Sequence, residues 1–151
     1  MQQIIAERFE IEQLVGSGGM GEVYRATDRL TGALVAVKLL QTSSAKDAVR
    51  FSREAQILAS LSHPNVVTVF DVGTHEGHVF LAMELVPGGN LNTWLRRKPR
   101  TTGEIIDRLI DAGRGLAAAP SAGAVHSDAH PHTHLFGLAA PQGSGHLARA
   151  M

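Results

Sequence analysis

The chain of 151 residues contains no cysteine, which excludes a disulfide scaffold, a cysteine nucleophile and a zinc site built from thiolates. It also has no excess of one charge, since Lys plus Arg and Asp plus Glu number 14 each. No net field therefore points to nucleic acid or an anionic membrane as a partner. No apolar run reaches the roughly 18 residues of a membrane span, and Met1 to Phe9 lacks a signal-peptide core. We expect a soluble, cytoplasmic protein.

The first half of the chain has the pattern of a small antiparallel sheet with one helix. Residues Phe9 to Leu40 predict three strands in a meander, interrupted by a glycine cluster and a turn. The apolar period then changes, and Asp47 to Leu61 predicts a helix that ends at His63-Pro64-Asn65. Two further strands are expected at Val66 to Val72 and Val79 to Leu85, joined by the turn Gly73 to His78.

The second half predicts helices followed by an irregular tail. After the break at Pro87-Gly88-Gly89, Leu91 to Leu95 predicts a short helix, and Thr101-x-x-Glu104 is typical of a capping box. The helix that follows has an apolar face made of Ile105, Ile106, Leu109, Ile110, Gly113, Leu116 and Ala117. Beyond Asp128 the composition shifts to His, Ala, Gly and Pro, and we expect no regular structure there.

A glycine-rich segment is the first candidate for chemistry. Residues Gly16 to Val23, read GSGGMGEV, fit the pattern G-x-G-x-x-G-x-V, in which missing side chains let backbone N–H groups approach phosphate oxygens. A dinucleotide site would need a helix at this point, whereas Glu22 to Thr27 continues as a strand. A glycine-rich hairpin that binds nothing is the alternative.

A lysine inside an apolar strand is the second candidate. Lys38 ends the segment Val35-Ala36-Val37-Lys38, where an ammonium group is costly unless fixed negative charge meets it. Ligand phosphates and the carboxylate of Glu54, on the following helix, could supply that charge. The alternative is an edge lysine that reaches water and a solvated glutamate.

Five features in this order resemble the N-terminal lobe of the protein kinase family, in particular bacterial serine/threonine kinases. They are the glycine loop, Lys38, Glu54, His63-Pro64-Asn65 and the segment Met83 to Gly89, MELVPGG. The resemblance implies an α+β fold, with a five-stranded antiparallel sheet and one helix followed by a partial helical C-lobe. The implied divisions are residues 1–88 for the ATP-binding lobe, 89–128 for the partial C-lobe and 129–151 for an irregular tail.

By the same resemblance, the site residues take the family's roles. The glycine loop would cover the phosphates of ATP, and Lys38 would hold the α and β phosphates while paired with Glu54. Met83 would be the gatekeeper, and the backbone of Glu84 and Val86 would hydrogen-bond the adenine edge. The implied ATP-contacting positions before the gatekeeper are Val15, Gly16, Ser17, Gly18, Gly19, Gly21, Val23, Ala36 and Lys38, of which Val15, Val23 and Ala36 would sandwich the adenine.

The resemblance weakens at the catalytic loop. The family's H-R-D-x-K-P-x-x-N is matched to the segment from His126 to Thr133, HSDAHPHT, so Asp128 is retained as the residue that positions the substrate hydroxyl. Ser127, His130 and Thr133 replace the arginine, the lysine and the magnesium-binding asparagine, respectively. No carboxylate side chain follows Asp128, and Leu135-Phe136-Gly137 has leucine where the family's Asp-Phe-Gly has its magnesium ligand.

Three interpretations follow. In the first, the chain is an ATP-binding segment of a kinase that has lost its own phosphoryl transfer, because it has no side chains to bind the metal. Its similarity to the family stops abruptly, as it would after a shift of reading frame. Alternatively it is a pseudokinase-like module that binds nucleotide or a protein partner without catalysis. A third interpretation is a metal-binding tail, because His126, His130, His132 and His134 fall within nine residues.

Overall fold

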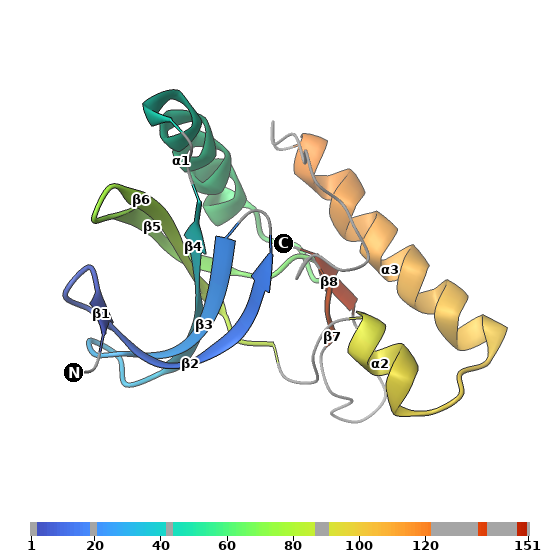
Figure 1. Ribbon diagram of the computed structural model, residues 1–151. Helices are drawn as coiled ribbons and strands as arrows, with labels where there is room; N and C mark the ends of the chain where they lie inside the picture. The colour runs from blue at the N-terminus through green and yellow to red at the C-terminus, as the bar shows by residue number, and fades with distance from the viewer. Residues whose placement is uncertain are drawn as a thin grey trace. The chain divides into compact units, whose positions relative to one another are not determined.

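The computed structural model describes residues 3–18, 21–41, 44–86, 91–121, 136–138 and 148–150. The chain divides into two compact units, one of residues 1–60 and 68–85 and the other of 61–67 and 86–151. The first unit is a six-stranded antiparallel sheet in the order β1-β2-β3-β4-β6-β5 with one helix (Figure 1). Its elements are β1 (Ile4–Ile5), β2 (Phe9–Gly18), β3 (Gly21–Asp28), β4 (Leu34–Leu40), α1 (Ala45–Ser60), β5 (Val69–His75) and β6 (His78–Glu84).

The α+β fold and the three-stranded meander are confirmed, but the sheet has one strand more than predicted. The short strand β1 pairs with the start of β2, Ile5 lying opposite Phe9. Two apolar residues are too few for a sequence period, so the sequence pattern did not reveal this strand. Ile5 and Phe9 are 0% and 1% exposed and belong to a core with Val37, Phe80 and others. The extra strand therefore closes one end of the core.

The β5–β6 turn is tighter than predicted, and β5 begins at Val69 and not at the predicted Val66. We expected a turn from Gly73 to His78, but only Glu76 and Gly77 form it, both with positive φ as a two-residue type I′ turn requires. Gly73 lies inside the strand, paired with Phe80. A Cβ atom at Gly73 would lie 2.7 Å from the Phe80 ring, so this glycine makes room for a core aromatic side chain and marks no turn.

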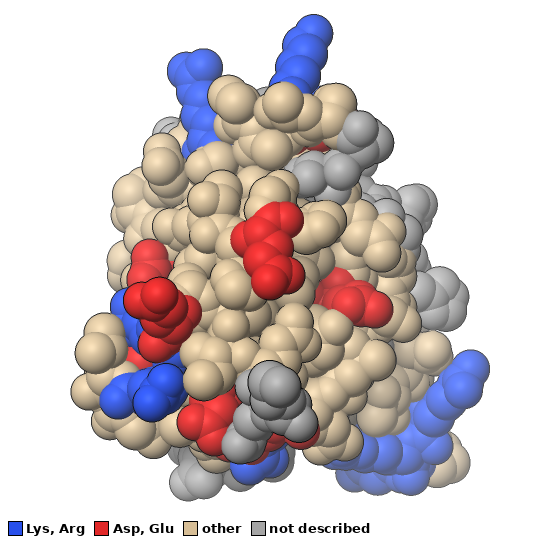
Figure 2. Space-filling model, turned by 60° about the vertical axis from the view of Figure 1, so that its left-hand side comes forward, with Lys and Arg blue, Asp and Glu red and all other residues tan. Residues whose placement is uncertain are grey.

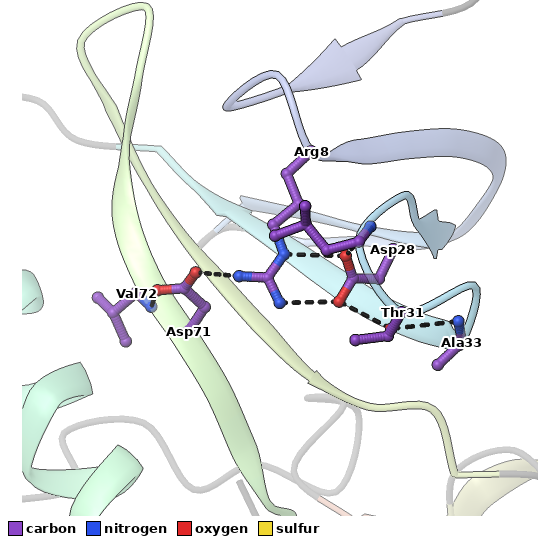
Figure 3. A network of polar contacts seen from close by, with 7 residues as sticks. Arg8, Asp28, Thr31, Ala33, Asp71 and Val72 are labelled. Atoms are coloured by element: carbon purple, nitrogen blue, oxygen red, sulfur yellow. Dashed lines mark hydrogen bonds and ion pairs between the residues drawn. The ribbon is translucent and has the colours of Figure 1, made fainter.

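Arg8 joins the two edges of the sheet. From the turn after β1, its guanidinium donates to both carboxylate oxygens of Asp28 at 2.9 and 2.8 Å and to Asp71 of β5 at 2.8 Å (Figure 3). Asp28 also accepts hydrogen bonds from the amide of Leu30 and the hydroxyl of Thr31. Since β1 and β5 are the outer strands, this network links the turn after one edge strand to the other edge strand. The hydrogen bonds from Arg8 hold the pKa of Asp28 well below its usual range.

Helix α1 covers part of the sheet by packing against β5 and β6. It begins two residues before the predicted start because Ser44 caps it, accepting a hydrogen bond from the amide of Asp47 at 3.2 Å. Ala55, 2% exposed, lies on its inner face.

The second unit contains two helices and a pair of short strands. The predicted capping box is confirmed, because the Thr101 hydroxyl accepts from the amide of Glu104 at 3.1 Å and the Glu104 carboxylate accepts from the amide of Thr101 at 2.8 Å. Residues 136–138 pair with 148–150, so the prediction of no regular structure after Asp128 is wrong for these six residues. The elements are α2 (Leu91–Arg97), α3 (Thr102–Ser121), β7 (Phe136–Leu138) and β8 (Ala148–Ala150).

The surface carries charges of both signs. Figure 2 shows acidic and basic side chains interspersed among uncharged residues, as expected from 14 of each. Among the residues described, no helix is both long and apolar enough to cross a membrane.

Candidate functional site

The glycine-rich segment forms a hairpin between β2 and β3. Gly18 lies opposite Gly21, and Gly16 lies opposite Val23. The register shifts between Leu14 and Gly16, so Val15 is the extra residue of a bulge, and it is 52% exposed. Gly16, Ser17 and Gly18 are therefore the last three residues of β2, next to the turn. Gly19 is outside the described residues.

Gly21 has a structural reason to be glycine. Its φ is +133°, a conformation that other residues rarely adopt, and a Cβ atom there would meet the carbonyl oxygen of Leu39 at 1.9 Å. At Gly18, by contrast, nothing lies within 4 Å of such an atom. The glycine at position 21 thus lets β3 start closely against β4, whether or not a phosphate binds. Its predicted phosphate contact remains a prediction.

Lys38 lies at the centre of a row that crosses four strands. Val23 pairs with Gly16 on one side and with Lys38 on the other, and Lys38 in turn pairs with Leu81. Directly paired residues of antiparallel strands share one face of the sheet, so the side chains of Val23, Lys38 and Leu81 share a face. Leu81, 8% exposed, was not among the predicted site residues, because nothing in an apolar strand distinguishes it by type.

Ala36 and Met83 extend the same face. They are paired with each other in β4 and β6 and lie two residues from Lys38 and Leu81, respectively. Val23, Ala36 and Met83 are 6%, 6% and 1% exposed. The structure thus brings together three predicted adenine-site residues and the predicted phosphate-binding lysine on one apolar face.

The opposite face of β3 carries an acidic side chain. Glu22 alternates with Val23 and accepts a hydrogen bond from the hydroxyl of Tyr24 at 2.5 Å. That hydrogen bond raises the pKa of Tyr24. Because Glu22 points away from the face of Lys38, its carboxylate does not oppose an anion there.

The segment after β6 was predicted to bind adenine through its backbone. The amide of Glu84 donates to the carbonyl of Thr68 at 2.9 Å, so a contact to adenine would fall to the Glu84 carbonyl. Val86 belongs to the second unit, and its predicted backbone contact with adenine stays a prediction.

The side chains of the other predicted catalytic residues lie outside the part of the chain that the structure describes. Glu54 lies in the middle of α1, but the position of its side chain is outside what the structure describes, so the ion pair with Lys38 stays a prediction. Asp128 and the histidines at 126, 130, 132 and 134 also fall outside the described residues. Within the described part of the chain, no three His, Asp or Glu side chains are grouped to hold a metal ion.

The donor chemistry fits a nucleotide better than a magnesium ion. A glycine hairpin with open space at Gly18, a lysine on an apolar face and small Ala36 suit a phosphate chain attached to a flat base. Magnesium instead requires oxygen ligands, chiefly carboxylates, and the sequence after Asp128 offers none from a side chain.

Comparison with known proteins places the chain in the protein kinase domain family. The family model described as protein kinase domain matches residues 9–136. The probable serine/threonine-protein kinase PknB of Corynebacterium glutamicum is 40% identical over 139 residues, covering 87% of this chain and 22% of the relative. The serine/threonine-protein kinase PknA of Mycobacterium tuberculosis is 38% identical over 141 residues, covering 87% and 33%. The chain thus spans about a fifth to a third of these relatives.

A solved structure agrees in fold. The kinase domain of Mycobacterium tuberculosis PknI, crystallised as a double mutant, superposes with a TM-score of 0.81 at 22% identity. The match covers 99% of this chain and 61% of that one. At this identity the likeness concerns the fold alone.

Proposed function

Because this chain belongs to the protein kinase domain family and resembles its bacterial serine/threonine kinases, we propose that residues 1–88 are an ATP-binding lobe. The observation that carries the proposal is the shared face of Val23, Ala36, Lys38 and Met83 beside the glycine hairpin. Residues 89–128 would begin the helical lobe of such a domain, and 129–151 would be a tail outside it. The cytoplasm is the proposed compartment.

The predicted ATP contacts follow the chemistry of these residues. The ammonium group of Lys38 would neutralise phosphate charge, aided by the backbone N–H groups of the hairpin. The side chains of Val15, Val23 and Ala36 would enclose the base, with Met83 behind it. The Glu84 carbonyl would accept from the adenine amino group, and the backbone of Val86 would supply the second base contact. Glu54 would hold Lys38 in position.

The family's reaction transfers the γ-phosphoryl group of ATP to a protein serine or threonine, normally with magnesium. We propose that the 151-residue chain binds ATP but does not carry out this transfer. Asp128 could position a substrate hydroxyl, yet Leu135 offers no carboxylate for the metal that the reaction needs. Counted from His126, the motif's metal-binding asparagine falls on His134 and not on Thr133, so no amide oxygen is offered there either. Its phosphoacceptor, if a longer form of this chain has one, would be a protein.

A second candidate function is a nucleotide-dependent or purely protein-binding module without enzymatic activity. Large aliphatic side chains exposed on α3, among them Leu109 at 53%, favour contact with another protein. The purely protein-binding form of this candidate differs from the first candidate in that nucleotide has no effect on it.

Thermal unfolding with and without millimolar ATP distinguishes the two. We expect ATP to raise the unfolding midpoint of the wild type and to have no effect on Lys38→Ala. Lys46→Ala is the matched control, because Lys46 is an exposed lysine of α1 and should leave the response intact. Equal responses of the wild type and Lys38→Ala would show that ATP does not use this face. No response of the wild type would favour the protein-binding module.

A further inference from the structure

Helix α3 points its large aliphatic residues outward. Ile106, Leu109 and Ile110 are 48%, 53% and 46% exposed. Its buried positions are instead Arg108 at 7%, Ala112 at 4% and the glycine at 115. An amphipathic helix of a self-contained unit normally buries its aliphatic side.

The packing of the buried side fixes this orientation. A Cβ atom at Gly115 would lie 2.4 Å from the carbonyl oxygen of Asn65, so the helix backbone approaches that loop as closely as a glycine permits. The guanidinium of Arg108 lies 5.7 Å from the ring centroid of Trp94. Rotating the helix to bury the aliphatic residues would break both contacts. The exposed aliphatic side is therefore a feature of the packing, and we call Ile106, Leu109, Ile110 and Gly113 the outer stripe.

The outer stripe has the spacing of a seam between two helices. Its residues follow i, i+3, i+4 and i+7, the repeat by which one helix packs along another. Gly113 has nothing within 4 Å of where its Cβ would be, which leaves space for a side chain of an approaching helix. Scattered single apolar residues would need no explanation, but a continuous row of this kind marks an interface.

The charges beside the outer stripe select the direction of the second helix. Asp107 and Arg114 are exposed and seven residues apart, so helical geometry places them on the same flank of the stripe. In an antiparallel pair of identical helices, residues of one flank meet the same flank of the other copy, in reversed order. Asp107 would then face Arg114 of the second copy, and the symmetry makes this contact twice. A parallel pair would set both charges against the uncharged flank of Ile105 and Leu116.

We propose that α3 pairs antiparallel with α3 of a second copy of this chain through the outer stripe. Arg114 is available for this contact, because its side chain is 68% exposed and lies 3.6 Å from Asp111 in an ion pair that solvent reaches. The pairing needs neither nucleotide nor metal. It is independent of the proposed ATP site on the sheet.

Sedimentation equilibrium of the 151-residue chain with charge-reversed variants tests the pairing. We expect a reversible dimer that Asp107→Arg or Arg114→Asp alone weakens by roughly tenfold or more, because each makes both symmetric contacts repulsive. The double variant should restore the wild-type dimer. Glu76→Arg, at an exposed turn in the other unit, is the control and should not change it. Circular dichroism of each variant checks that the helices are retained.

Crosslinking tests the direction directly, because the chain has no cysteine of its own. After oxidation, a mixture of Asp107→Cys and Arg114→Cys should give a disulfide-linked heterodimer, and each variant alone should give little crosslinked product. A chain that stays monomeric, associates without regard to the charge reversals, or crosslinks most readily from Asp107→Cys to itself would overturn the proposal. So would a monomer that is instead captured by a different protein at this surface.

Discussion

The backbone of Leu39 occupies the space that a side chain on Gly21 would need. Gly21→Ala must therefore move β3 away from β4 or strain a residue at a φ of +133°. We expect a loss of stability of about 2 kcal/mol or more, from the clash and the unfavourable backbone conformation together. Chemical denaturation of the wild type and the variant measures it. An unchanged midpoint would mean that the hairpin does not pack against β4 in this way.

Gly18 provides the matched comparison within the same hairpin. Nothing lies within 4 Å of a Cβ atom at this position, and its φ is not in the left-handed region, so Gly18→Ala should unfold like the wild type. If Gly18 approaches the phosphates of ATP, the same variant should still lose part of the ATP-induced rise in midpoint. Retention of the full rise would remove Gly18 from the proposed site without affecting the role of Lys38.

The comparison of these glycines shows why the sequence predicted the fold better than the site. Alternation, the break at His63-Pro64-Asn65 and the capping box at Thr101 depend on local chemistry, and the meander, α1 and α3 follow from them. Gly21 and Gly73 have roles set by residues of the neighbouring strand, Leu39 and Phe80, and the residues next to each glycine in the sequence do not indicate these contacts. The sequence pattern treated Gly73 as a turn residue for this reason.

The long-range ion pairs show the same limit. Arg8, Asp28 and Asp71 are separated by 20 and 63 residues, and no spacing rule connects them. Helix α3 shows a related limit of prediction from sequence. Its apolar period correctly predicted a helix with an aliphatic face. The period could not say that Gly115 and Arg108 would form the buried side, because close approach to Asn65 determines it.

Removing the carboxylate of Asp28 should destabilise the sheet in a pH-dependent way. Its side chain is 5% exposed and pairs with Arg8, so Asp28→Asn should cost on the order of 2 kcal/mol at pH 7. The pKa of Asp28 is depressed in the folded state, mainly by the hydrogen bonds from Arg8, so this stabilisation is fully present above the unfolded pKa of about 4. It declines as the pH falls from there towards the folded pKa.

Urea unfolding at several pH values checks this. The difference between the wild type and Asp28→Asn should be constant from about pH 6 to pH 8 and shrink below about pH 4. Glu12→Gln is the control, because Glu12 and Arg25 are paired at a partly exposed surface, 32% and 44%, and should contribute much less. A difference that grows on acidification would contradict the assigned ion pair.

Replacing each of two glycines of α3 by alanine should change the stability of the protein in opposite directions. Both substitutions gain helix propensity, about 1 kcal/mol in a helix interior. Gly113→Ala meets open space and should be stabilising, whereas Gly115→Ala would place its Cβ 2.4 Å from the Asn65 carbonyl oxygen and should be destabilising. Thermal unfolding at low protein concentration, where self-association contributes least, measures both. Two stabilising substitutions would mean that α3 does not pack against the loop containing Asn65.

The last prediction concerns phosphoryl transfer by the 151-residue chain. Catalysis in this family consists of positioning and of neutralising charge on the phosphoryl group. Asp128 alone cannot supply the second function, because Thr133 offers a neutral hydroxyl at best, and His134 and Leu135 offer no oxygen ligand. Loss of one positioned electrostatic contributor typically costs about a hundredfold to a thousandfold in rate, and here the aspartate and asparagine metal ligands are both replaced.

Incubation with radiolabelled ATP and magnesium, and then manganese, should accordingly give no label on the chain or on a generic protein substrate above the level of Asp128→Ala. The chain's ATP-induced rise in unfolding midpoint, measured on the same preparation, shows that the nucleotide is bound while transfer is absent. Label that the wild type acquires and Asp128→Ala does not would contradict the prediction. It would mean that residues after Asp128 provide the metal with ligands other than carboxylates, for which the histidines at 130, 132 and 134 would be the first to substitute.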